Sequence, residues 1–194
     1  MSVLAIRHGR GGGAAVPRLG ARIVAVAVVA LGVGALAGCT TEPEPAPTPT
    51  AAFANEEEAF AAAEKVYRAY NEALNELDPA LPETFEPLFL LASGGLEAAD
   101  RENFSVMHAE GHIISGDARV ASFEGESSSP PYDLVIAAIC LDVSAVNVMD
   151  ANGNSLVAPG RPDMYALSVE FVAGDDRPLT MDSSRRVGDE QCTD

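Results

Sequence analysis

Three residues spaced two apart form the group in this chain that is best suited to chemistry. His108, Glu110 and His112 would project from one face of an extended strand. Two imidazoles and a carboxylate could bind zinc with an open position for water, or exchange protons near neutral pH. The helical zinc-protease pattern needs Glu directly after the first His, where Ala109 stands, and Gly111 disfavours a helix. The alternative is a solvated strand face near a turn. We favour that alternative and expect no metal site.

A second oxygen-rich segment, Asp150-Ala151-Asn152-Gly153-Asn154, has the composition of a calcium loop. It lacks the remaining spacing and the distant Glu of an EF-hand. Asn-Gly readily adopts the positive φ of a tight turn, so we expect a hairpin turn. After residue 39 the sequence contains no glycine-rich phosphate loop and no Gly-x-Ser-x-Gly motif. We therefore expect no cofactor.

Cys39 has a different chemistry. Leu36-Ala37-Gly38-Cys39 closes the uncharged, mostly apolar stretch 23–37, which follows four arginines, Arg7, Arg10, Arg18 and Arg22. This arrangement resembles the lipobox of bacterial lipoproteins, which implies that residues 1–38 are a cleaved signal peptide and that Cys39 carries lipid. The apolar stretch is shorter than the about twenty residues that span a bilayer. The alternative is an ordinary signal peptide that happens to contain a cysteine. Adjacent arginines are missing, so we expect general secretory export.

The charge of the mature chain limits its partners. Loss of the four signal-peptide arginines leaves eight of the 12 basic residues beside 29 acidic ones, a formal charge of about −21 at pH 7. Such a chain is repelled by nucleic acid and by anionic lipid headgroups. We therefore expect no nucleic-acid binding, and expect the membrane as a partner only through the lipid on Cys39, on the outer face of the cell membrane.

Cys39 is followed by a proline-rich segment, so residues 39–54 are interpreted as a lipidated cysteine and a disordered linker. Pro43, Pro45, Pro47 and Pro49 alternate with Glu, Ala and Thr. Alternating prolines favour the extended polyproline II conformation, and such a sequence cannot bury a core.

The remaining residues, 55–194, have the size of one domain with a single core. Asn55 and Glu58 match a capping box. Apolar residues then recur at three- and four-residue steps and predict a long amphipathic helix that ends near Asp78-Pro79. Residues 81–104 predict two shorter helical pieces, interrupted by Gly94-Gly95.

From residue 104 the pattern changes to runs rich in Val, Ile, Phe and Tyr, bounded by turn residues. These runs predict strands over residues 104–114, 118–123, 132–148, 164–172 and 179–183. The third run is long for one strand, so we expect a bend or bulge near Asp142. Helices first and antiparallel strands afterwards are typical of the α+β class.

This order of elements resembles the cone-shaped NTF2-like fold. The stretch Ile139-Cys140-Leu141-Asp142-Val143-Ser144, followed by Asp150-Ala151-Asn152-Gly153, is similar to that of actinobacterial secreted lipoproteins of this kind, and a single lysine, Lys65, beside eleven arginines suits a GC-rich genome. The resemblance implies a long N-terminal helix and shorter helices packed on a curved antiparallel sheet. Because the superfamily includes enzymes, ligand binders and interaction domains, the fold leaves the function open.

Asp142 is a candidate catalytic residue within this resemblance. If Leu134, Ile136, Ala138 and Cys140 line one face of the strand, Asp142 continues that face and points into the mouth of the cone. Enzymes of this fold often place an acid or a histidine there. The alternative is an aspartate that accepts hydrogen bonds from backbone amides in a bend.

Two cysteines remain once Cys39 carries lipid. Outside the cytoplasm Cys140 and Cys192 are expected to form a disulfide that fastens the C-terminal tail to the sheet. The alternative is two free thiols. Their spacing is unlike Cys-x-x-Cys, so the expected role is structural.

Three functions compete. The first, which we favour, is a membrane-anchored module that binds a small ligand or another envelope protein. The second is a small-molecule enzyme of NTF2-like type that uses Asp142 or the pair His108 and His112; the sequence singles out no certain catalytic residue. The third is a purely structural envelope lipoprotein.

Overall fold

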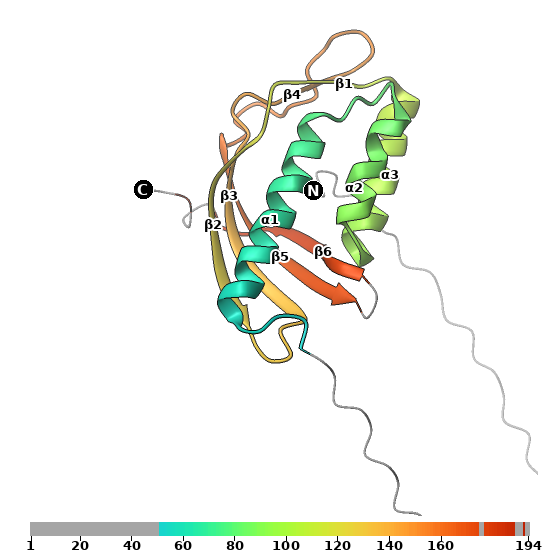
Figure 1. The fold of residues 1–194 in the computed structure, drawn as a ribbon. Helices are drawn as coiled ribbons and strands as arrows, with labels where there is room; N and C mark the ends of the chain where they lie inside the picture. Colours follow the sequence, from blue (N-terminus) through green and yellow to red (C-terminus); the bar gives the residue numbers. More distant parts are fainter. Residues whose placement is uncertain (1–50, 175–176, 189–191, 193–194) are drawn as a thin grey trace, which may run out of the picture. The chain divides into compact units, whose positions relative to one another are not determined.

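The computed structural model describes residues 51–174, 177–188 and 192 (Figure 1). The predicted signal peptide of residues 1–38, the lipidation site Cys39 and most of the predicted linker lie outside the described residues. Four helices precede six strands in the described chain: α1 (Glu56–Asn75), η1 (Pro82–Phe85), α2 (Glu86–Leu91), α3 (Gly94–Glu110), β1 (Ile113–Ser115), β2 (Arg119–Ser128), β3 (Leu134–Asp142), β4 (Asn147–Met149), β5 (Met164–Gly174) and β6 (Arg177–Arg186). The predicted α+β class is confirmed.

A reciprocal cap fixes the start of α1. The Asn55 side-chain oxygen accepts a hydrogen bond from the Glu58 amide at 2.9 Å, and the Glu58 carboxylate accepts one from the Ala54 amide at 3.0 Å. Just before it, the Ala52 amide donates to the Pro131 carbonyl at 2.9 Å, and Phe53 packs against the core. Residues 51–54, which the sequence assigns to the linker, therefore contact the body of the domain.

The core lies between the helices and one face of a four-stranded antiparallel sheet of order β2-β3-β5-β6 (Figure 1). Because side chains alternate along a strand, Val135, Ala137, Ile139 and Leu141 point from β3 toward the helices and are buried. From α1 the buried residues are Ala59, Ala63, Tyr67 and Tyr70, at the three- and four-residue steps expected of one helix face. This is the layering that the resemblance to an NTF2-like cone implies.

Gly125 on β2 sets how closely α1 approaches the sheet. The ring of Phe60 occupies the place where a Cβ atom at position 125 would lie. Two turns of helix further on, the Tyr67 ring lies 6.4 Å from the Phe123 ring, and Phe123 in turn meets Phe171 edge to face at 6.2 Å. A continuous aromatic layer therefore joins α1 to the sheet.

The long strand predicted over residues 132–148 is divided by a turn, as expected near Asp142. Strand β3 ends at Asp142, and the Asp142 carboxylate accepts a hydrogen bond from the Ser144 amide at 2.9 Å. The chain then enters β4, which pairs with β1 in a separate two-stranded sheet with Ile113 opposite Met149.

One predicted element is wrong. Residues 104–114 do not form a strand, because α3 continues through Glu110 before the short strand β1. The helix buries Leu96, Asp100 and Phe104, which are spaced by four residues along one face. Gly111 does not interrupt a helix here but ends one. Its φ of 66° is the left-handed conformation that commonly closes a helix.

The start of α3 is anchored on β6. The Ser93 amide donates to the Met181 carbonyl at 2.8 Å, and the Ser93 hydroxyl donates to the Asp182 carboxylate at 3.3 Å. Gly94 has a φ of 51°, and the Asp182 carboxylate occupies the place where its Cβ atom would lie. Gly94 therefore begins α3 in contact with the sheet, and the break that the sequence places at Gly94-Gly95 lies just before it, between the end of α2 at Leu91 and the start of α3.

A disulfide joins Cys140 to Cys192, which confirms the expected pairing and excludes two free thiols in this structure. Cys140 belongs to the alternate set of β3 residues that points away from the helices, so the bond lies on the outer face of the sheet. Within the described ranges, no helix has both the length and the apolar character needed to cross a bilayer.

Removing the disulfide should destabilise the domain without changing its fold. The bond joins residues 52 positions apart. In the chain-entropy model a loop of that size stabilises by on the order of 4 kcal/mol. We expect urea unfolding of the double variant Cys140→Ser, Cys192→Ser to show about this loss. Reductant should bring the wild type to the same midpoint and leave the double variant unchanged; equal midpoints for oxidised and reduced wild type would contradict the prediction.

Candidate functional site

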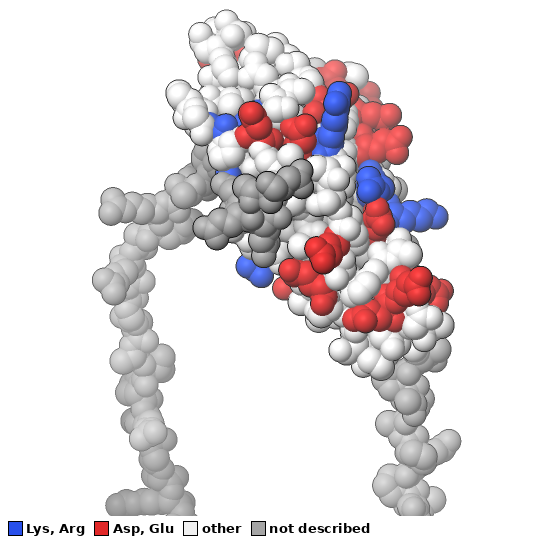
Figure 2. All heavy atoms as spheres, turned by 90° about the vertical axis from the view of Figure 1, so that its left-hand side faces the viewer, with Lys and Arg blue, Asp and Glu red and all other residues white. Residues whose placement is uncertain are grey.

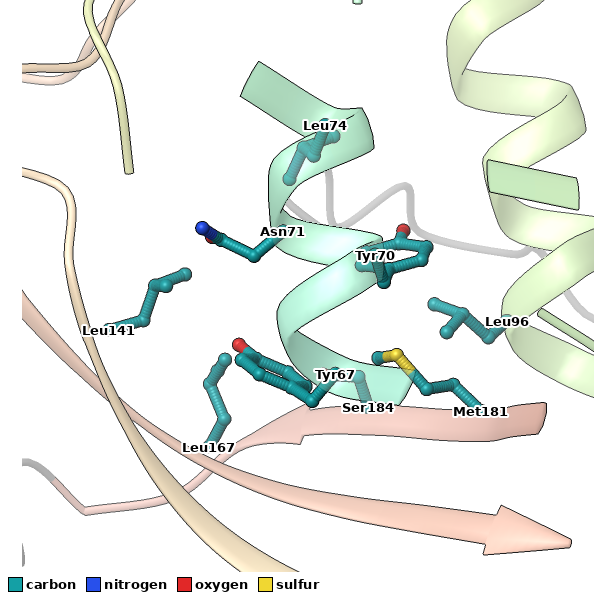
Figure 3. Close-up of a pocket in the computed structure, with 9 residues that line it drawn as sticks. All are labelled: Tyr67, Tyr70, Asn71, Leu74, Leu96, Leu141, Leu167, Met181 and Ser184. Carbon is teal, nitrogen blue, oxygen red and sulfur yellow. The ribbon is translucent and has the colours of Figure 1, made fainter. Parts of the chain in front are cut away.

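The space between α1, α3 and the sheet is almost completely filled. A cavity of about 20 Å³ remains there, roughly enough for one water molecule. Figure 3 shows the side chains that surround it: Tyr67, Tyr70, Asn71 and Leu74 from α1, Leu96 from α3, and Leu141, Leu167, Met181 and Ser184 from the sheet. Apolar atoms therefore form most of the wall.

Asn71 gives this cavity its most polar feature. Its side-chain nitrogen donates to the Ala118 carbonyl at 3.1 Å. Its side-chain oxygen is buried and has no hydrogen-bond partner among the described residues. One water molecule in the cavity would satisfy this oxygen, which is the usual solution for a buried polar atom.

A buried carboxylate lies beside the cavity. Asp100 on α3 is 2% exposed, and one of its oxygens accepts a hydrogen bond from the Tyr70 hydroxyl at 2.7 Å. Burial raises the pKa of Asp100, and the hydrogen bond from Tyr70 lowers it by a smaller amount. Burial, followed by the Asp100 charge, raises the pKa of Tyr70. The pair ties α1 to α3.

Asp100 is not among the site residues predicted from the sequence, although the sequence carries a signal for it. Leu96, Asp100 and Phe104 occur at four-residue steps, which places the carboxylate in the middle of an apolar helix face. An acidic residue at such a position must be hydrogen-bonded or carry a shifted pKa. All three residues lie within residues 81–104, which the sequence predicts as helical, so this signal was available before the structure.

The three residues that could have formed a metal site do not come together as predicted. His108 lies in the last turn of α3, and its Nδ1 is 2.7 Å from the Pro79 carbonyl oxygen. Because a carbonyl only accepts, Nδ1 carries the hydrogen. His112 follows the helix and contacts the Glu110 carboxylate through Nε2 at 2.9 Å. The two imidazoles thus have separate partners, and no group of three or more metal-binding side chains exists in the described part of the chain.

Asp142 does not point into the cone, contrary to the expectation from the sequence. The residues of β3 that line the interior are the odd-numbered ones, whereas Asp142 belongs to the outer set with Cys140. Hydrogen bonds from Ser144, the side chain first and the backbone amide second, lower the pKa of Asp142. Asp142 therefore stabilises the turn after β3, the alternative role that the sequence left open.

The Asp150 segment forms a turn, as predicted. The Asp150 carboxylate accepts hydrogen bonds from the backbone amides of Asn152 and Asn154, each at 2.8 Å, and Gly153 has a φ of 85°. Hydrogen bonds from Asn154, and more weakly from Asn152, lower the pKa of Asp150. Its oxygens are thus engaged within the turn.

A larger concave site lies at the end of the domain where α1 and α3 finish. We call it the end groove, and it has a volume of about 350 Å³. One wall is the chain after α1 and the other is the junction of α3 with β1. Its residues are Leu77, Asp78, Pro79, Ala80, Gly111, His112, Ile113 and Ile114. No sequence pattern indicates this groove, because its two walls are far apart along the chain.

Acidic side chains prevail on the surface. In the view of Figure 2 they outnumber the lysines and arginines and are distributed over much of the face. Some of the basic groups are engaged: Arg68 pairs with Glu64 at 2.7 Å and Arg101 with Glu97 at 2.8 Å, each one helical turn apart. Uncompensated negative charge therefore dominates the described surface.

Comparison with known proteins identifies no family. No family model matches the chain, and no curated protein matches it. Similar solved structures include the intermembrane space region of the chloroplast protein ARC6, with a TM-score of 0.48, 13% identity, and coverage of 66% of this chain and 96% of that chain. Another is a protein from Catenulispora acidiphila in complex with S-DNPA, with a TM-score of 0.43, 16% identity, and coverage of 69% and 95%. At such scores these similarities do not bear on function.

The buried Asp100 carboxylate should make stability depend on pH. Its pKa in the folded protein is raised above the ordinary value of 3.8. The folded state therefore holds the proton more tightly than the unfolded state, and stability falls as pH rises through this range. Asn at position 100 cannot ionise but can still accept from Tyr70. We expect the melting temperature of Asp100→Asn to rise relative to that of wild type as the pH increases above about 4.

Tyr70→Phe provides the matched control for this titration. This variant keeps the Asp100 carboxylate but removes the hydroxyl that donates to it. The free energy of unfolding should therefore fall by about 1–3 kcal/mol, and the decrease should be larger at higher pH. Parallel melting curves for wild type and Asp100→Asn across the whole pH range would contradict this account of Asp100.

Proposed function

We propose that this protein is a lipid-anchored, extracytoplasmic module that binds another protein through its outer surface. The observation that carries the proposal is the filled interior. Small-molecule sites are usually cavities of roughly 300–1,000 Å³, whereas the space between the helices and the sheet is about 20 Å³. A domain whose interior has no room for a substrate presents its surface instead.

The positions of the polar residues also favour binding over catalysis. Asp142 lies on the outer face of the sheet in a turn, and His108 is held by the Pro79 carbonyl. The Tyr70–Asp100 pair is buried in the helix layer. General acid–base chemistry needs such groups within hydrogen-bond reach of a substrate, and the cavity of about 20 Å³ beside the Tyr70–Asp100 pair is too small to hold one.

The proposed location rests on two features. The resemblance of Leu36-Ala37-Gly38-Cys39 to a lipobox, and of the domain to actinobacterial secreted lipoproteins, supports export and lipid attachment at Cys39. The disulfide between Cys140 and Cys192 is of a kind that persists outside the cytoplasm. More than one acyl chain is needed for stable anchoring, because a single chain binds a bilayer only marginally.

Lipid attachment is tested by metabolic labelling. Cells that express the full chain are grown with a radioactive fatty acid, and the protein is expected to become labelled. Cys39→Ser should lose the label and leave the membrane fraction, because a strongly acidic chain has little affinity for anionic lipid. Cys140→Ser serves as the control and should keep its label. Label retained on Cys39→Ser would refute the anchor.

Protein binding is tested by photo-crosslinking of the full chain in intact cells. A photoreactive amino acid is placed singly at exposed apolar positions on separate surfaces: Leu90 on α2, Ile113 on β1 and Leu134 on β3. We expect a discrete adduct with another protein from at least one position, and no adduct of the same size from a buried control position, Leu88. No adduct at any position, with a melting temperature raised by a small molecule, would instead favour the ligand-binding or enzyme alternatives.

A further inference from the structure

We infer that the end groove binds a segment of a partner protein that carries an apolar side chain between lysines or arginines. This inference rests on the proposed function, since it assumes that the domain binds a protein, and it names the surface and the chemistry of the partner. Its grounds are the shape of the groove, the rigidity of its walls and the charges around it.

The groove suits a side chain that projects from another protein. Leu77, which contributes to its lining, is 5% exposed, so the floor is apolar and continuous with the core. Ile113 is 49% exposed and Leu81, the residue after one wall, is 46% exposed. Asp78 and Gly111 are exposed as well. A site with such open walls leaves much of a small molecule in water, whereas a partner surface would cover its rim.

The walls are held in place by the fold itself. The imidazole of His108 ties the end of α3 to the Pro79 carbonyl of the opposite wall at 2.7 Å. Within that wall the Asp78 carbonyl accepts from the Leu81 amide and the Asp78 carboxylate from the Ala80 amide, each at 2.9 Å. On the other side Ile113 and Ile114 are paired with β4. Binding therefore orders few new groups, which lowers its entropic cost.

The residues that line the groove include the carboxylate of Asp78 and no lysine or arginine. Residues 76–84 and 105–118, which contain the lining residues and their neighbours along the chain, include no lysine or arginine, and the next residue is Arg119. They contain five exposed carboxylates: Glu76, Asp78, Glu83, Glu110 and Asp117. Glu76, Glu83 and Asp117 form no ion pair with another described residue. Such a rim attracts a basic segment and repels an acidic one.

The same charges argue against a second copy of this chain as the occupant. The chain has a formal charge of −17, and its body carries most of the 29 acidic residues. Two such acidic surfaces would repel each other at the groove. A basic partner is therefore the occupant that the charges select.

The position of the groove leaves it accessible on an anchored protein. The described chain begins at residue 51, next to the start of α1, and the groove lies beside the other end of that 20-residue helix, near β1 and β4 (Figure 1). A helix of that length spans about 30 Å. A domain held through its N-terminus would therefore carry the groove at the end away from its attachment.

The test uses the full lipidated chain in detergent micelles and a phage-displayed library of short random peptides as the probe. Selected peptides are expected to carry an apolar residue flanked by lysine or arginine. Their affinity should fall about ten-fold with Ile113→Ser, which removes an apolar contact. It should fall by a similar factor with Glu76→Lys, which replaces a negative charge by a positive one. Binding should also weaken as salt is raised, since the rim charges are exposed.

Glu57→Lys is the matched control, because it makes the same change of charge at the opposite end of α1. It should leave the affinity nearly unchanged, and all three variants should keep the wild-type melting temperature, since the altered side chains are exposed. Selected peptides that are acidic or lack charge, or an equal loss of affinity in Glu57→Lys and Glu76→Lys, would overturn the inference.

The outcome in cells separates this inference from the proposed function. An adduct formed from position 113, and lost when the same chain also carries Glu76→Lys, supports both the groove and the protein-binding function. Adducts from position 90 or 134 with none from position 113 would overturn the groove as the binding surface and leave the protein-binding function standing. No adduct at any position and no selected peptide would overturn both.

Discussion

The close packing of α1 on the four-stranded sheet is the constraint on which the rest of the structure depends. The Phe60 ring rests on the bare backbone of Gly125, and Tyr67 meets Phe123. Interior positions of β3 and β5 then fill the remaining space with Ile139, Leu167 and Phe171. Dispersion and burial of apolar area favour this contact, and protein interiors tolerate few voids.

This packing decides where the domain can act. A sheet that curves around a helix could enclose a ligand site, but here Tyr67, Leu141 and Met181 occupy that space. The polar atoms that remain inside are used in structure: Tyr70 binds Asp100, and the Asn71 amide binds the Ala118 carbonyl. Binding is consequently expected at the outer surface, where the end groove is larger than the interior cavity.

The disulfide and the hydrogen bonds at the start of α3 fasten further segments of the chain to the sheet. Cys192 is fastened to the outer face of β3 through Cys140, while Ser93 joins α3 to Met181 and Asp182 of β6. The sheet is thus held from both faces, by helices on one side and by Cys192, near the C-terminus, on the other. The end groove is rigid for the same reason, since one of its walls is the end of α3, which is fixed on the sheet.

The sequence by itself determined the features that depend on local chemistry. The Asn55 cap, the periodicity of α1, the Asn-Gly turn after Asp150 and the order of helices before strands all follow from neighbouring residues. The pairing of Cys140 with Cys192 followed from the number of cysteines and the expected compartment. Only the tertiary structure decided which face of β3 is buried, and so placed Asp142 outside. It also decided that α3 continues to Glu110, because packing of Phe104 against Phe89 of α2 and of Met107 against the core outweighs a local pattern that resembled a strand. The end groove, finally, joins two segments distant in the chain, and no local pattern can indicate a contact that only packing creates.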